Sequence, residues 1–191
     1  MIEKIRCDWV PLNKPTYVKY HDEEWGVPVR DDQKMFEFLV LESFQAGLSW
    51  EIILNKRDHF RKAFDGFDFN KVALFDEEKV QSLLQDKGIV RNQLKIRAAI
   101  NNAQRYLEVI DKFGSFCTYF WGFTDGKPLT NHFKVMADIP ASTELSNTIA
   151  KDLKSRGFKF MGTTVVYAHM QAVGMVNDHI ENCFRYNKVQ P

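Results

Sequence analysis

Residues 153–164 read LKSRGFKFMGTT and decide the fold. Apolar residues recur at helical spacing on both sides of this stretch, and the stretch contains residues that end and start helices. Gly157 can end the first helix, since glycine readily adopts the left-handed conformation that follows a helix. Thr163 or Thr164 can cap the second helix with its hydroxyl. The stretch therefore predicts two helices joined by a short turn.

The same helical periodicity extends along most of the chain. Asp31 or Asp32, Ser49 and Asp76 are suited to cap helices, and Gly88 is suited to end the third of these helices. Apolar residues follow at steps of three and four in the segments 35–40, 50–64, 80–84, 96–110, 145–153 and 166–173. No segment alternates at every second residue as a half-buried strand does. The fold class is therefore predicted to be all-α.

The bulk composition is that of an ordinary globular protein. The 191 residues are 45% hydrophobic and 27% charged, and they suffice for one core without disulfides. We expect a single unit over residues 1–191. The alternative is two helical lobes with the site between them: a central bundle over about 31–135, and the joined N- and C-terminal segments.

Charge and hydropathy narrow the choice of partners. The net charge is only +1, so binding to nucleic acid would need a local basic patch. The first residues do not form a signal peptide, and no apolar run has the length of a membrane span. We therefore expect a cytoplasmic protein with no membrane partner.

The turn between the two C-terminal helices can also hold a phosphate. Gly162 has no side chain, so the backbone there can come close to a ligand, and the free N–H groups that start the next helix attract an anion. Lys154, Arg156 and Lys159 add positive charge. Such a contact grips DNA without reading its sequence. The alternative is a plain helical hairpin whose lysines are only solvated.

Two cysteines and two histidines lie near opposite ends of the chain, namely Cys7 and His21, and His179 and Cys183. A total of three cysteines at wide spacing is unlike a disulfide framework. If residues 179–183 are helical, His179 and Cys183 leave the same face one turn apart. A set of two cysteines and two histidines fills a tetrahedral zinc sphere and leaves no position for water, as in structural zinc sites. The alternative is two buried cysteines and two surface histidines with no common role.

Aromatic residues gather in an irregular, proline-flanked segment near the N-terminus that contains Tyr17, Tyr20 and Trp25. Glu42 lies on an otherwise apolar helix face, shortly before Trp50. A buried carboxylate needs a partner, and aromatic walls beside one acid suit a flat, positively charged heterocycle. The alternative is that these aromatic side chains belong to the core and that Glu42 is exposed.

Six short motifs make the chain resemble the 3-methyladenine DNA glycosylase I family over residues 6–183. They are RCDWV at 6–10, YHDEEWGVP at 20–28, LESFQAGLSW at 41–50, GIVRNQLKI at 88–96, RGFKFMGTT at 156–164 and NDHIENC at 177–183. Six motifs in the family's order are far more specific than any one of them. The resemblance therefore favours the functional interpretations above over their alternatives.

The resemblance implies a fold of the helix-hairpin-helix DNA glycosylase superfamily, in which residues 156–164 form the hairpin that grips DNA. It also implies one structural zinc ion per chain, held by Cys7, His21, His179 and Cys183. The base pocket that it implies is formed by Tyr17, Tyr20, Trp25, Glu42 and Trp50. Glu42 and Tyr20 are the residues expected to be catalytic.

Contacts to DNA are implied at two places. Gly47 and Leu48 would lie on the loop that enters the gap left by the flipped base. The hairpin would contribute Lys159, Gly162, Thr163 and Thr164. Phe44 stands where we expect the loop to carry a polar residue, which leaves the contacts to the opposite strand open.

The activity that the resemblance implies is DNA base-excision repair. The enzyme would flip 3-methyladenine out of alkylated double-stranded DNA and hydrolyse its N-glycosidic bond, with 3-methylguanine left open as a further substrate. Methylation at N3 makes the adenine cationic, so it can leave as a neutral base while water attacks the sugar. Asp178 is a second-rank candidate for stabilising the sugar cation. No lysine stands at the position that a Schiff-base mechanism would use after Gly162. We expect a monomer that uses no organic cofactor.

Two other functions compete with this interpretation. A zinc-stapled module could recognise damaged DNA without cleaving it, but such a module has no need for a carboxylate in a base-sized pocket. A zinc hydrolase or deaminase needs an open zinc position, which four protein ligands do not leave. A deaminase also carries an HxE motif with PCxxC, which the sequence lacks.

Overall fold

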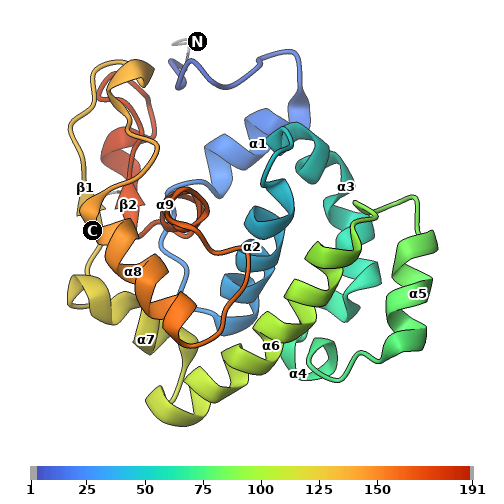
Figure 1. Ribbon diagram of the computed structural model, residues 1–191. Coiled ribbons are helices and arrows are strands. Elements are labelled where there is room, and N and C mark those ends of the chain that lie inside the picture. Colours follow the sequence, from blue (N-terminus) through green and yellow to red (C-terminus); the bar gives the residue numbers. More distant parts are fainter. Residues whose placement is uncertain (1–3, 190–191) are drawn as a thin grey trace.

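The computed structural model describes residues 4–189 and is predominantly helical, as the periodicity predicts (Figure 1). The α-helices are α1 (Pro15–Glu23), α2 (Asp32–Gln45), α3 (Trp50–Ala63), α4 (Phe69–Val72), α5 (Glu77–Gln85), α6 (Gln93–Phe113), α7 (Phe116–Trp121), α8 (Glu144–Ser155) and α9 (Thr163–Ala172). The short 3-10 helices are η1 (Asp65–Phe67), η2 (Gly122–Thr124), η3 (Met136–Asp138) and η4 (Tyr186–Lys188). Within the described residues, no helix is both long enough and apolar enough to cross a bilayer.

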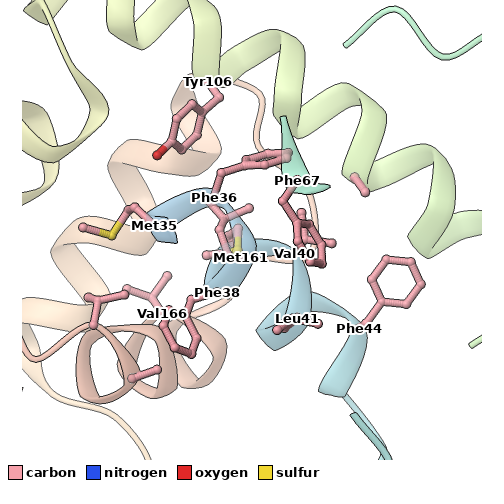
Figure 2. Close-up of a cluster of buried hydrophobic side chains, with 14 of the residues drawn as sticks. Met35, Phe36, Phe38, Val40, Leu41, Phe44, Phe67, Tyr106, Met161 and Val166 are labelled. Atoms are coloured by element: carbon pink, nitrogen blue, oxygen red, sulfur yellow. The ribbon is translucent and has the colours of Figure 1, made fainter. Parts of the chain in front are cut away.

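Helix α2 lies at the centre of the core. Its residues from Met35 to Phe44 are all buried, so this helix is covered on every side. It packs against α3, α6, α7 and α9. Figure 2 shows side chains of α2 meeting Phe67, Tyr106 from α6, and Met161 and Val166 from the region of α9. A helix enclosed in this way is fixed in position, and a polar side chain on it must find its partners inside the protein.

Two of the expected helix starts are confirmed by capping hydrogen bonds. The carboxylates of Asp31 and Asp76 each accept a backbone N–H from the third residue on, at 2.7 and 2.9 Å. Ser49 precedes α3, but its side chain makes no capping bond. Gly88 does not end α5, because the helix stops at Gln85. A Cβ at Gly88 would lie 2.6 Å from Nδ1 of His59, so close packing explains this glycine.

Three local expectations are wrong. The aromatic segment after Lys14 is not irregular: it forms α1, which begins with Pro15 at its first position, where the fixed φ of proline suits a helix. Residues 179–183 are not helical. Strands β1 (Leu129–Thr130) and β2 (Val176–Asn177) form a short parallel pair that the sequence pattern did not indicate. Two-residue strands are too short to show an alternating pattern.

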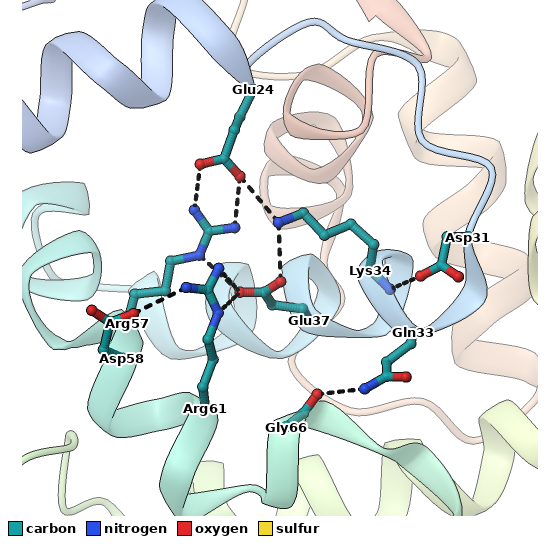
Figure 3. A network of polar contacts seen from close by, with 9 residues as sticks. All are labelled: Glu24, Asp31, Gln33, Lys34, Glu37, Arg57, Asp58, Arg61 and Gly66. Atoms are coloured by element: carbon teal, nitrogen blue, oxygen red, sulfur yellow. Dashed lines mark hydrogen bonds and ion pairs between the residues drawn. The ribbon is translucent and has the colours of Figure 1, made fainter.

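A network of five charged side chains joins the end of α1 to α2 and α3 (Figure 3). Arg57 donates two hydrogen bonds to Glu24, at 2.9 and 2.8 Å, and one to Glu37, at 2.8 Å. Arg61 and Lys34 pair with Glu37 at 2.8 and 3.1 Å. Because Glu24 directly follows α1, the network fixes where the aromatic residues of that helix lie.

Candidate functional site

A cavity of about 390 Å³ opens between α1, α2 and α3 on one side and α9 with residues 136–141 on the other. All five residues of the predicted base pocket line it: Tyr17, Tyr20, Trp25, Glu42 and Trp50. They come from α1, the turn after it, α2 and the first residue of α3. The helices thus bring together residues that are up to 33 positions apart in the sequence, from Tyr17 to Trp50.

Aromatic rings form one wall of the cavity, and Trp9 is a member that the sequence analysis missed. The ring of Trp9 lies edge-on, 5.7 Å from the ring of Tyr17 and 5.0 Å from that of Trp25. Tyr20 and Trp50 are 5.3 Å apart. Trp9 belongs to the RCDWV motif. The one sign in the sequence that Trp9 lies beside the site is that it follows Cys7 by two residues. Such a wall offers flat apolar faces on which a heterocycle can stack.

Glu42 is buried in this cavity, which rules out the alternative that it is exposed. Its exposed fraction is 4%, and burial raises the pKa of its carboxyl group to about 8. No hydrogen bond or ion pair from residues 4–189 reaches this carboxyl group. It is also the only acidic or basic side chain among the described residues that line the cavity. A ligand that brings an N–H donor or a positive charge would supply the partner that Glu42 lacks.

The opposite wall consists, apart from Thr164, of residues that the sequence analysis did not single out. Met136, Ile139, Pro140 and Ala141 come from η3 and the loop after it, and Thr164, Tyr167, Ala168 and Gln171 come from α9. The loop has no periodic pattern, so its approach to the cavity could not be predicted. The cavity is therefore lined by segments from both halves of the chain.

Asp178 does not line the cavity. Its carboxylate is fully buried and accepts hydrogen bonds from the Tyr167 hydroxyl at 2.6 Å, Gln171 Nε2 at 2.8 Å and Asn131 Nδ2 at 2.7 Å. Both oxygens are thus occupied, and Tyr167 and Gln171 stand between Asp178 and the cavity. The position is that of a group that holds the wall in place, not one that touches a bound molecule.

The predicted metal ligands Cys7, His21, His179 and Cys183 converge into one cluster. Their ligand atoms all lie within 4.8 Å of one another, and all four side chains are buried. The histidines are therefore not surface residues, and the alternative of four unrelated side chains is wrong. The cluster joins the segment before α1 to the segment after β2, although residues 179–183 are not helical.

The geometry of the cluster fits a tetrahedral ion. The Sγ atoms of Cys7 and Cys183 lie 3.6 and 3.5 Å from Nδ1 of His179, and Cys183 Sγ lies 3.5 Å from Nε2 of His21. Metal–sulfur and metal–nitrogen bonds of about 2.3 and 2.0 Å at tetrahedral angles give a sulfur–nitrogen separation of roughly 3.6 Å. The cluster can therefore hold a metal ion with four protein ligands.

The second ring nitrogen of each histidine has a partner that fixes its role. His179 Nε2 lies 3.0 Å from the carbonyl oxygen of Trp25, and His21 Nδ1 lies 2.9 Å from Asp22. Each of these nitrogens donates its proton, which leaves the nitrogen that faces the cysteines free to bind a cation. Arg6 in turn holds Asp22 through two hydrogen bonds, at 2.8 and 2.7 Å. Because Trp25 also lines the cavity, its backbone contact with His179 links the cluster to the cavity.

The loop between α2 and α3 carries Gly47 and Leu48. Gly47 has a φ of +78°, which favours glycine, and a Cβ placed there would meet nothing within 4 Å. Gln45 lines the cavity and donates a hydrogen bond to the carbonyl oxygen of Leu48 at 2.8 Å. Phe44 is fully buried against other aromatic rings, so the polar residue next to the loop is Gln45.

The hairpin between α8 and α9 has the predicted turn. Gly157 follows α8 with a φ of +87°, and the N–H groups of Gly157 and Phe158 bond to the carbonyls of Lys154 and Leu153, at 3.0 Å each. This pair of bonds is the Schellman motif, which satisfies the last carbonyls of a helix. The second helix differs from the prediction, because its N-cap is Gly162 and not a threonine.

The side chains of the hairpin divide into engaged and free groups. Thr163 is the first residue of α9, and its hydroxyl bonds to Asn147 Oδ1 at 2.6 Å. Arg156 bonds to Asp152 at 2.6 Å and lies over the ring of Tyr119, so it supports α8 and is not free to meet a phosphate. Lys159 is exposed. A Cβ at Gly162 would meet nothing within 4 Å, so an anion can approach the N–H groups that start α9.

Residues 9–186 match the family model of methyladenine glycosylase. The chain belongs to the methyladenine glycosylase family. It is 46% identical to DNA-3-methyladenine glycosylase 1 of Escherichia coli, covering 97% of this chain and 99% of that protein. It is 41% identical to DNA-3-methyladenine glycosylase of Haemophilus influenzae, covering 93% of this chain and 96% of that protein.

Solved structures of methyladenine glycosylases have the same fold. A crystal structure of 3-methyladenine DNA glycosylase I is 47% identical, covers 98% of this chain and 100% of its own, and has a TM-score of 0.91. A variant of 3-methyladenine DNA glycosylase I in complex with 3-methyladenine is 33% identical, covers 95% of this chain and 97% of its own, and also has a TM-score of 0.91. The resemblance inferred from six motifs is thereby confirmed.

Proposed function

We propose that the protein is a DNA-3-methyladenine glycosylase that acts in base-excision repair. The observation that carries this proposal is Glu42, a buried carboxyl group without a partner, set among aromatic rings in a base-sized cavity. Relatives that are 46% and 41% identical carry this enzyme name. A binding module without catalysis has no need to bury an acid at this cost.

The reaction needs little acid–base catalysis by the protein. Adenine methylated at N3 is a cation within DNA, so the bond between C1′ of the sugar and N9 breaks with its electron pair going to the base, which leaves neutral. Water forms the new bond to C1′ and loses a proton. The enzyme's task is therefore to unstack the base, hold it and shield it while water attacks.

Glu42 and the aromatic rings would divide this task. Tyr20, Trp25 and Trp50, with Tyr17 nearby, would stack on the base, and Glu42 would accept its exocyclic N–H. A cation placed beside Glu42 favours the ionised carboxylate and lowers the raised pKa of that group. The carboxylate would then distinguish methylated from ordinary adenine by charge. Of these residues, Glu42 and Tyr20 are the ones that we propose are catalytic.

Replacing Glu42 tests the proposed function directly. Glu42→Gln keeps the shape and one acceptor oxygen but removes the charge, and losing a charge-assisted hydrogen bond costs about 1.5–3 kcal/mol, or roughly ten- to two-hundredfold in rate. We expect single-turnover release of 3-methyladenine from methylated DNA to slow by that factor, affinity for the free base to fall, and affinity for undamaged duplex to stay the same.

Two controls make this experiment decisive. Glu77→Gln removes an exposed acid of α5, whose side chain is 59% exposed, and should leave base release unchanged. Base release by the wild-type protein must be measured in parallel. If the wild-type protein binds methylated duplex but releases no base, it is a damage-recognition module. If Glu42→Gln equals the wild type in rate and base affinity, Glu42 is a structural residue.

We also propose two contacts to double-stranded DNA. Gly47 and Leu48 would enter the gap left by the flipped base. The hairpin, through Lys159, Gly162 and the free N–H groups of Thr163 and Thr164, would hold one phosphate. Lys159→Ala should weaken binding to all duplexes alike and make the salt dependence shallower, whereas Lys71→Ala, an exposed lysine on α4, should not. An effect confined to particular sequences would contradict the proposal.

The ion that we propose for the cysteine–histidine cluster is zinc, one per chain, with a structural role. Two sulfur and two nitrogen ligands suit zinc, and four protein ligands leave no position for water. Cys183→Ser should lose the metal and lower stability before it changes which base is released. Cys117→Ser, which alters a buried cysteine outside the cluster, should retain the metal. Elemental analysis that finds well below one zinc per wild-type chain would overturn this assignment.

The remaining proposals concern organisation. We propose a cytoplasmic monomer without an organic cofactor, in which residues of about 31–135 form one lobe and the joined terminal segments form the other, with the cavity between them. Light scattering on the purified protein should give the mass of one chain, 22.3 kDa, and with duplex the mass of one chain plus one duplex. A dimer under both conditions would contradict this.

A further inference from the structure

Helix α6 buries two polar side chains that the proposed reaction does not use. Lys95 is 7% exposed and Asn102 is fully buried. They are seven residues apart, which is about two turns, so both side chains leave the same face of the helix at a separation of roughly 10 Å along its axis. Burying an ammonium group and an amide is costly unless each finds partners. The partners of these two residues indicate what they do.

Lys95 holds the loop after α2. Its Nζ donates hydrogen bonds to the carbonyl oxygens of Phe44, at 2.8 Å, and Ala46, at 2.5 Å. No acidic side chain within residues 4–189 pairs with it. The last carbonyls of a helix lack partners inside the helix and carry partial negative charge, so this ammonium group takes the place of a cap. The loop that carries Gly47 and Leu48 thus starts from a point fixed by α6.

Asn102 holds the hairpin in the same way. Its Nδ2 donates to the carbonyl oxygen of Lys159 and its Oδ1 accepts the N–H of Lys159, at 2.8 Å each. The neighbouring Asn101 adds a hydrogen bond from its Nδ2 to the carbonyl oxygen of Gly157, at 2.9 Å. Both backbone groups at the centre of the turn are therefore tied to α6, beside which the turn passes (Figure 1).

We propose that α6 is the spacer that sets the distance between the two DNA-contacting segments, with Lys95 and Asn102 as its positioning residues. This inference rests on the proposed function, which assigns the loop and the hairpin to DNA. A duplex has fixed dimensions, so a residue inserted into the base stack and a grip on a phosphate must be in register at the same time. A misplacement of about 1 Å in such an arrangement can lower a rate by roughly a hundredfold.

Lys95→Met tests the loop end of the spacer. It keeps an unbranched apolar side chain but removes the charge and the donors. We expect single-turnover release of 3-methyladenine from duplex to slow by about ten- to a hundredfold. Affinity for free 3-methyladenine and for undamaged duplex should stay within about twofold of the wild type, because the cavity and the hairpin are intact. If Lys95→Met does not fold, Lys95→Gln, which keeps a donor, is measured in the same way.

Asn102→Leu tests the hairpin end. It has a similar volume but cannot bond to Lys159, so the turn loses its attachment to α6. We expect affinity for all duplexes to fall by about tenfold, with the salt dependence altered, while affinity for the free base again stays within about twofold. Asn102→Asp keeps the acceptor for the N–H of Lys159 but sets a carboxylate oxygen against the carbonyl oxygen of Lys159, so it should not restore the affinity.

A matched control separates positioning from general stability. Val109→Ala removes buried methyl groups from the same helix without touching a bond to either segment. Assayed below the melting temperature of every variant, it should lose stability and keep both duplex affinity and excision. The proposal is overturned if Lys95→Met and Asn102→Leu match Val109→Ala in every DNA measurement, or if both lower affinity for the free base as much as excision. The proposed function fails separately, if the wild-type protein releases no base.

Discussion

Glu37 and Glu42 lie five residues apart on α2 and are almost equally buried, at 6% and 4% exposure, yet their surroundings are opposite. Glu37 meets three cations, Lys34, Arg57 and Arg61 (Figure 3). Burial alone would raise the pKa of Glu37, but these cations outweigh burial and lower the pKa. Glu42 meets none of them, and burial raises its pKa to about 8.

The difference shows how one helix serves both architecture and chemistry. A buried acid is tolerated when partners from the same chain surround it, and such a group holds elements together. A buried acid without partners weakens the fold, and here it faces a cavity where a ligand can compensate for the lack. Burial therefore does not distinguish the two glutamates, whereas the list of partners does.

Breaking the paired site should have the largest effect on stability. Arg57→Met takes from the buried Glu37 one of its three cations and from the partly exposed Glu24 the partner that holds both of its oxygens. Removing one member of a buried ion pair costs about 3–5 kcal/mol. Denaturant unfolding near neutral pH measures this loss. A loss no larger than that of an exposed pair would mean that water reaches the network and that the contrast between the two glutamates is smaller than the burial implies.

Replacing the unpaired Glu42 by a neutral residue should raise the free energy of unfolding, by an amount that depends on pH. A glutamate in the unfolded chain ionises above about pH 4.5, whereas Glu42 in the folded protein keeps its proton up to about pH 8. Ionisation therefore stabilises the unfolded state of the wild type, and the free energy of unfolding falls as pH rises through this range. Glu42→Gln is free of this loss. We expect the variant to gain roughly 4 kcal/mol over the wild type at about pH 8, relative to the difference at about pH 4.5.

Unfolding curves of both proteins across this pH range test the sign. A difference between variant and wild type that does not change with pH would show that Glu42 has a partner or an ordinary pKa. Together with slower base release, a gain in stability would mark Glu42 as a group kept for function at a cost to the fold.

The smallest effect is expected at the edge of the network. Lys34 is one-third exposed, and Glu37 keeps Arg57 and Arg61 as partners when Lys34 is replaced. Lys34→Met should therefore lower the free energy of unfolding by only about 0.5–1 kcal/mol. Lys79→Met is the matched control, since Lys79 is equally exposed but lies 3.8 Å from Asp65, and it should cost less. Equal effects of the two changes would show that Lys34 contributes nothing specific to Glu37.

Much of the helical fold could be predicted, because capping and periodicity are local. Asp31 and Asp76 cap helices through bonds that span only three residues, so the sequence around them carries the information. Helix α1 was missed because its buried residues are few and its apolar pattern is weak. The parallel pair of β1 and β2 joins segments far apart in sequence, which no local pattern shows.

Part of the site was predicted, and the residues that were missed have one cause in common. Tyr20, Glu42 and Trp50 were found because motifs in a known order placed them together. Trp9 and the wall at Ile139 and Pro140 lie in loops without a periodic pattern, and only the tertiary structure brings them to the cavity. Lys95 and Asn102 were overlooked because a polar residue on a helix resembles a solvated one until its partners are known.

The cysteine–histidine cluster also sets when the molecule can be completed during synthesis. Cys7 meets His179 across 172 positions of sequence, so the N-terminal segment cannot complete its contacts until residues 179–183 have left the ribosome. Helix α1 can pack against α3 before then, but the cluster and the wall of the cavity formed by α9 must wait. A nascent chain can form α2 and α6 early, but it cannot close its cavity. The cavity therefore has both of its walls only in a chain that has been synthesised through α9.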